Sequence, residues 1–136
     1  MKKYLIALVL LVSGSVFAQS ELCLDSNECV SQPGLFHGWN EKEKTAFYTS
    51  EALLAADWIQ TAQGQNKFSA YIEQNPILGT HPSQAKIATY FTSVMVGQYF
   101  LGEALGENKI YLFGAVATLE LVVVKKNYSA GLRFNF

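Results

Sequence analysis

The stretch E-Q-N-P-I-L-G-T-H-P-S, residues 73–83, separates the apolar segments of this 136-residue chain and determines how they are connected. Proline fixes the φ angle and biases the preceding residue towards extended conformations, so Asn75-Pro76 and His81-Pro82 each form a stiff corner. Pro82 also suits the first turn of a helix, where its missing N–H would have no partner. The stretch therefore predicts a rigid connection that ends one helix and starts the next.

The chain begins with the pattern of a secretory signal peptide. Lys2-Lys3 form a short positive region, and Tyr4 to Val12 is an uncharged apolar run. Small or permissive residues follow at Val16-Phe17-Ala18, where a signal peptidase cleaves. The pattern predicts a signal peptide over residues 1–18, cleaved after Ala18, and therefore an exported protein. The apolar run is too short to cross a bilayer as a permanent helix.

The remaining residues, 19–136, are enough for one domain with a modest core. Without Lys2 and Lys3, eight basic side chains stand against eleven acidic ones, which gives a formal charge of −3. The charges are sparse and mixed, so we expect no nucleic-acid partner. Half of all residues are apolar. This apolar fraction is high for a small soluble domain but low for a protein wholly embedded in lipid.

Cys23 and Cys29 are the only cysteines. Because an exported chain meets an oxidising environment, the simplest interpretation is a Cys23–Cys29 disulfide that closes the turn over residues 24–28. Two sulfurs without paired histidines make a weak metal site, and the turn lacks the glycine and closing glutamate of a calcium loop. Residues 19–40 are therefore predicted to form an N-terminal loop with one disulfide and no metal.

The first helix is predicted over residues 41–62. Asn40 fits its N-cap, and acidic residues follow in the first turn, where the helix dipole favours them. Gly64 weakens the helix, so residues 64–75 are expected to be a broken continuation of it.

Two further helices are predicted over residues 82–105 and 110–124. The stretch from Ile87 to Gly102 carries no charge, and the last helix would be about 22 Å long, short of the ~30 Å hydrocarbon core. From Tyr128 to Phe136 the residues alternate between two faces, which is the pattern of a β-strand.

These segments allow three architectures: a helical hairpin bundle in the inner membrane, the same helices as a periplasmic domain, or a small outer-membrane β-barrel. Residues 41–62 show helical rather than period-two spacing, so the helical architectures are favoured. The predicted fold class is therefore mainly α. About three apolar helices form a small, membrane-associated hairpin bundle over residues 41–136, with a short C-terminal β-like tail.

Five polar residues lie in or beside apolar sequence and need an explanation: Asp57, Glu73, Asn75, His81 and Glu120. A buried carboxylate is costly unless it is paired, protonated or in contact with water. One hypothesis is a cluster that binds an ion or moves a proton, and two carboxylates could also support general acid–base catalysis. The structural alternative, which is favoured, is that Asp57 accepts hydrogen bonds from Thr61 or from the helix start near His81.

Other motifs with a defined chemistry are absent from the sequence. No Gly-rich phosphate loop, nucleophile elbow or H-E-x-x-H motif is present, so no cofactor is predicted. His81 alone is more typical of a structural or capping residue than of a ligand, and His37 makes a weak second ligand. Packing is the preferred interpretation of the aromatic residues Tyr90, Phe91, Tyr99 and Phe100.

The chain resembles a group of small, uncharacterised hydrophobic envelope proteins from bacteria and phages. The shared pattern is D-x3-T at Asp57 and Thr61, E-x-N-P-I-L-G-x-H-P-S at residues 73–83, and a later apolar segment with Glu120 and Asn127. The resemblance covers about residues 50–136 and is most specific at N-P-I-L-G-x-H-P-S. It implies a small helical protein, adds Asn127 to the candidate polar residues and brings no enzymatic activity with it.

The sequence therefore predicts an exported, envelope-associated protein, in the inner membrane facing the periplasm or in the periplasm, with the outer membrane less favoured. The favoured function is that of a non-enzymatic structural or accessory protein. Its expected partner is a membrane or an envelope protein, and a homo-oligomer stays open. The competing class is a small enzyme or an ion- or proton-binding protein that uses Asp57, Glu73, His81 and Glu120.

Overall fold

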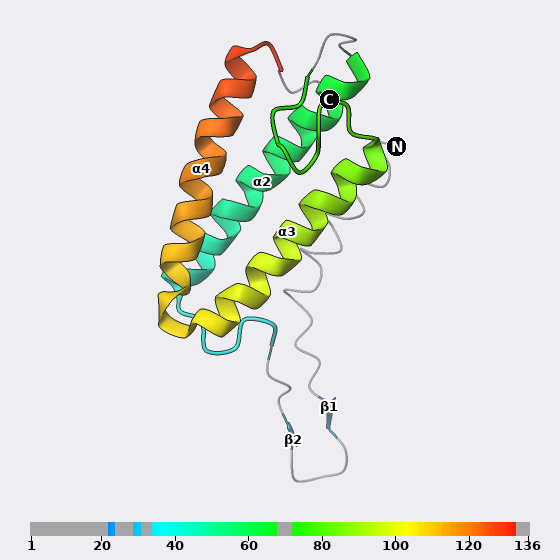
Figure 1. Cartoon of the computed structure of the whole chain (residues 1–136). Coiled ribbons are helices and arrows are strands. Elements are labelled where there is room, and N and C mark those ends of the chain that lie inside the picture. Colours follow the sequence, from blue (N-terminus) through cyan, green and yellow to red (C-terminus); the bar gives the residue numbers. More distant parts are fainter. Residues whose placement is uncertain (1–21, 24–28, 31–33, 68–71, 133–136) are drawn as a thin grey trace. The chain divides into compact units, whose positions relative to one another are not determined.

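The computed structural model of the chain describes residues 22–23, 29–30, 34–67 and 72–132 (Figure 1). The chain divides into two compact units, Met1–Trp39 and Asn40–Phe136. The protein is mainly α-helical over the described residues, as the sequence predicts. None of the helices described is both long enough and apolar enough to cross a membrane. The predicted signal peptide, residues 1–18, lies outside the described residues.

The first unit contains a short antiparallel ladder within the predicted N-terminal loop. β1 (Leu22–Cys23) pairs with β2 (Cys29–Val30), and the backbone register sets Cys23 opposite Cys29. Directly opposed positions on neighbouring strands suit the short Cα separation of a disulfide. The structure describes the backbone of Cys23 and Cys29 but not their side chains, so the disulfide stays a prediction.

The second unit begins with α2 (Glu41–Lys67), the longest helix described. Its start is a reciprocal cap: the Glu43 N–H donates to Asn40 Oδ1 at 3.0 Å, and the Asn40 N–H donates to Glu43 Oε2 at 2.8 Å. This confirms Asn40 as the N-cap. The predicted break after Gly64 is wrong, because the helix continues to Lys67 with Gly64 buried inside it. Tertiary packing outweighs a helical glycine, which costs only about 1 kcal/mol.

The connection over residues 72–83 leads into α3 (Gln84–Leu105). Ser83 is the N-cap, since its Oγ accepts a hydrogen bond from the Lys86 N–H at 3.2 Å. Pro82 therefore lies before the cap, and its predicted place in the first helical turn is wrong. A serine side chain satisfies an unpaired N–H of the first turn, which a proline ring cannot do.

A single 3₁₀ turn, η1 (Gly106–Asn108), joins α3 to α4 (Lys109–Ser129). Gly131, with φ of 94°, then ends α4. Its N–H donates to Tyr128 O at 3.1 Å, and the Leu132 N–H donates to Asn127 O at 3.0 Å, which together form a Schellman motif. The strand prediction is therefore wrong at Tyr128 and Ser129, which are helical, and residues 133–136 lie outside the described residues.

Both α3 and α4 pack against α2 (Figure 1). The centre of the core consists of Leu54, Leu78, Ile87 and Phe91, and Trp58 stacks on Phe91 with ring centroids 6.0 Å apart. Leu78 comes from the connection and is only 2% exposed. The connection is therefore part of the core as well as a link between helices.

Candidate functional site

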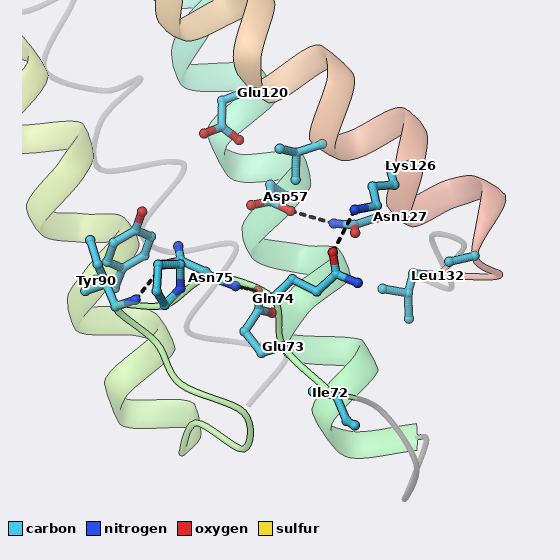
Figure 2. Close-up of a pocket in the computed structure, with 14 residues that line it drawn as sticks. Asp57, Ile72, Glu73, Gln74, Asn75, Tyr90, Glu120, Lys126, Asn127 and Leu132 are labelled. Atoms are coloured by element: carbon cyan, nitrogen blue, oxygen red, sulfur yellow. Dashed lines mark hydrogen bonds between the residues drawn. The ribbon is translucent and has the colours of Figure 1, made fainter.

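A pocket of about 720 Å³ lies between α2, α4 and the connection (Figure 2). This volume falls within the range of small-molecule sites, about 300–1,000 Å³. Its lining combines three carboxylates with amide, apolar and aromatic side chains. The lining residues are Asp57 of α2, residues 72–77 of the connection, Tyr90 of α3, Glu120, Val123, Lys126 and Asn127 of α4, and Ala130 and Leu132 beyond it.

Asp57 lies in α2, where only 9% of its surface is exposed. Asn127 Nδ2 of α4 donates to Asp57 Oδ1 at 2.7 Å. Burial, and after it the negative charges of Glu120 and Glu73, raise the pKa of Asp57 to about 7, although the Asn127 hydrogen bond opposes the shift. Asp57 is therefore able to gain or lose a proton near neutral pH.

Glu120 is the only charged residue between Ile110 and Val124, and its side chain lines the pocket (Figure 2). Its Oε2 atom is buried and has no hydrogen-bond partner in the described part of the chain. Burial raises the pKa of Glu120. A buried carboxylate oxygen without a donor favours either the protonated acid or a bound donor, such as an ammonium group.

The connection holds Glu73 in place by its own hydrogen bonds. The Glu73 N–H donates to Thr80 O at 3.1 Å, and Glu73 Oε1 accepts from the Asn75 N–H at 2.9 Å. Asn75 Oδ1 accepts from the Ile77 N–H at 2.9 Å, and Asn75 O accepts from the Gly79 N–H at 3.0 Å. Gly79 has φ of 76°, a left-handed conformation that glycine adopts without strain. This turn therefore presents one carboxylate to the pocket in a fixed position.

One ammonium group also lines the pocket. Lys126 Nζ donates to Gln74 Oε1 at 2.7 Å and so joins α4 to the connection (Figure 2). The described residues contain no group of three His, Cys, Asp or Glu side chains that could hold a metal ion. With all groups ionised, three carboxylates face one ammonium group, so the pocket has an acidic balance.

The structure brings most of the predicted polar residues to this pocket: Asp57, Glu73, Asn75, Glu120 and Asn127. Thr61 is buried outside the pocket lining, and His81 is exposed. The hydrogen bond to Asp57 comes from Asn127 at the end of α4, whereas the structural alternative expected Thr61 or the start of α3 near His81 as the donor. His37 is exposed and belongs to the first unit.

Sequence reasoning missed several residues of the site. The sequence predicts only a packing role for Tyr90, and it does not mark Gln74, Lys126 or Leu132 as part of a site. The sequence does contain a signal for the side of α4 that faces the pocket. Glu120, Val123 and Asn127 have the spacing of one helical face. The predicted end of the helix at residue 124 left Asn127 outside this face, although α4 continues to Ser129.

A second polar cluster joins α2 to α3. Gln98 Nε2 donates to Ser50 Oγ at 2.6 Å and to Glu51 Oε1 at 3.0 Å. Burial raises the pKa of Glu51 to about 7. The Oε1 atom of Gln98 is buried without a hydrogen-bond partner among the described residues. These hydrogen bonds link the two helices, so we interpret the residues as a contact between helices.

No protein-family model matches the chain, and no curated protein or solved structure is detectably similar to it.

Proposed function

We propose that the chain is an exported, envelope-associated binding protein without enzymatic activity, and that its pocket takes up a small organic cation. The observation that carries the proposal is the convergence of Asp57, Glu73 and Glu120 on one cavity, with the pKa of Asp57 raised to about 7. The envelope location is supported by the signal-peptide pattern of residues 1–18.

The electrostatics of the pocket favour a cation. Neighbouring negative charges contribute to the raised pKa of Asp57, and a positive charge among them would oppose that effect. The buried Oε2 of Glu120 would gain the donor that it lacks. Because protons compete with the cation for Asp57, we expect binding to be tighter at about pH 8 than at about pH 5.

The remaining lining favours a cation with a hydrocarbon part. Ile72 and Ile77 line the pocket and are 60% and 66% exposed, so they lie on its open side. Val123 and Leu132 contribute further apolar side chains to the pocket wall, and Tyr90 contributes an aromatic ring. A protonated amine with an apolar body would bury that body against these side chains and direct its charge to the carboxylates.

Benzylammonium and benzyl alcohol are suitable probes, because they have the same ring and nearly the same size but differ in charge. Isothermal titration calorimetry with the full chain at about pH 8 should detect the amine and show far weaker binding of the alcohol, and a lower pH should weaken the amine. Equal affinity for the two compounds would refute the proposed cation selectivity.

Matched variants assign the binding to the pocket. Asp57→Asn and Glu120→Gln each remove one pocket charge with little change in size, and we expect each to weaken benzylammonium by about tenfold, or about 1.4 kcal/mol. Glu107→Gln removes an exposed carboxylate of η1 and should leave the affinity unchanged. An affinity that falls equally in all three variants would show that only the overall charge matters.

A further inference from the structure

The outward side of α4 is apolar and lacks charge along most of its length. Tyr111, Leu119 and Val122 are 75%, 66% and 62% exposed, and their spacing places them on one face of the helix. Glu120, the one charged residue between Ile110 and Val124, is directed into the pocket instead. Lipid or protein, but not water, is the favourable environment for such a face.

The outward side of α3 has the same character. Val96 and Phe100 are 51% and 64% exposed, and the other exposed residues of this face, Thr89, Thr92 and Ser93, are small and uncharged. The stretch 87–102, which is uncharged, and the stretch 110–124, whose one charge is Glu120, extend about 24 Å and about 22 Å along their helices. We call the exposed residues 89–100 of α3 and 111–122 of α4 the outer face.

Charged residues occupy the two ends of the outer face. α3 and α4 run in opposite directions (Figure 1), so the start of α3 and the end of α4 lie at the same end of the second unit. Exposed Lys86, Lys125 and Lys126 lie there, whereas exposed Glu103 and Glu107 lie at the other end. Lys86 Nζ and Lys126 Nζ donate to Leu78 O and Gln74 Oε1, both uncharged groups. Lys86 therefore keeps its charge available to an anionic partner, whereas Lys126 also lines the pocket and faces its carboxylates.

We infer that the outer face docks onto the surface of a lipid bilayer that carries anionic headgroups. Apolar side chains of α3 and α4 enter the headgroup–acyl boundary, as they do for amphipathic helices that lie in the interface, and the lysines at one end meet the headgroups. The opposite sides of both helices stay packed on α2 with their polar residues, including Gln98 and Glu120. The inference rests on the proposed envelope location but not on ligand binding in the pocket.

Vesicle flotation of the full chain tests this inference. We expect the protein to float with vesicles of phosphatidylcholine and phosphatidylglycerol, and more weakly with phosphatidylcholine alone. Val122→Asp places a charge in the outer face and should abolish flotation, whereas Thr49→Asp places one on the exposed side of α2 and should not. Circular dichroism of both variants shows whether each remains helical, and Leu119→Ser replaces Val122→Asp if that variant unfolds.

Two charge-reversal variants test the orientation of the protein on the bilayer, in which the lysines at one end of the outer face meet the headgroups. Near an anionic surface each lysine strengthens binding by about fivefold, so Lys125→Glu should weaken flotation with the anionic vesicles by more than that. Lys42→Glu changes the net charge equally at the start of α2 and should have little effect. Equal losses in the two variants would overturn the proposed orientation. A protein that does not float, and forms a dimer that Val122→Asp dissociates, would overturn the lipid assignment in favour of a second copy of the chain.

Discussion

Asn127 Nδ2 donates to Asp57 Oδ1 at 2.7 Å, and the same Asn127 accepts the Leu132 N–H at its backbone oxygen at 3.0 Å. One residue near the end of α4 therefore fixes the buried carboxylate of α2 and also closes the Schellman motif that ends α4. Gln60, fully buried on α2, reinforces the arrangement, because its Nε2 donates to Leu132 O at 3.1 Å. The pocket and the end of α4 thus depend on each other.

Two substitutions of Asp57 test this dependence. Asp57→Asn keeps an oxygen that can accept from Asn127, so we expect its stability near neutral pH to equal or exceed that of the native chain. Asp57→Leu leaves Asn127 Nδ2 without its acceptor and should lower the free energy of unfolding by about 1–3 kcal/mol. Urea denaturation measures both. If the two variants are equally stable, the Asn127–Asp57 bond does not hold α4 to α2.

Stability should fall as the pH rises from about 4 to about 7. The pKa values of Asp57 and Glu51 are raised to about 7 in the folded chain from ordinary values of 3.8 and 4.5. The folded state therefore binds more protons than the unfolded state in this interval, and its advantage is lost as the carboxyls ionise. We expect a higher melting temperature at about pH 5 than at about pH 8.

Neutral variants identify the groups responsible for that pH dependence. Asp57→Asn and Glu51→Gln should each reduce the difference between the two melting temperatures, mainly by raising the value at about pH 8. Glu107→Gln, at an exposed position, serves as the control and should leave the difference unchanged. If neither buried variant changes the difference, other groups cause the pH dependence.

The end of α4 offers a matched pair of glycine substitutions. Gly131 has φ of 94° in the Schellman motif, so Gly131→Ala should lower the free energy of unfolding by about 1 kcal/mol and loosen Leu132, which lines the pocket. Gly114 is helical, and a Cβ atom there would meet nothing within 4 Å, so Gly114→Ala should stabilise the chain by up to about 1 kcal/mol. Thermal unfolding of the pair should therefore show shifts of opposite sign.

Local sequence signals predicted the parts of the fold that depend on neighbouring residues. Asn40 and the acidic residues after it marked the start of α2, and Asn75-Pro76 marked the turn that carries Glu73. The wrong predictions had two causes: tertiary packing overrules some local signals, and elsewhere one local signal hides another. Gly64 does not break α2, because it is buried in a packed helix. At the C-terminus, the alternating pattern from Tyr128 obscured Gly131, which is a helix-stop signal.

The candidate site could be predicted only in part, because the sequence of a single segment does not determine which other helix it packs against. The cost of burying a carboxylate singles out Asp57 and Glu120, and this cost is a property of each residue alone. That Asn127 and Gln60 hold α4 to α2 depends on the register between two helices far apart in the sequence. Such a register follows from complete packing and not from periodicity.

Protonation of Asp57 should be coupled to the binding of a cation in the pocket. A titration of the Asp57 carboxyl carbon by ¹³C NMR, with Asp57→Asn to assign the signal, tests it most directly. We expect an apparent pKa near 7 in the chain alone and a clearly lower value in the presence of saturating benzylammonium. A carboxyl that titrates near its ordinary value of 3.8, or one whose pKa does not respond to the amine, would contradict the account.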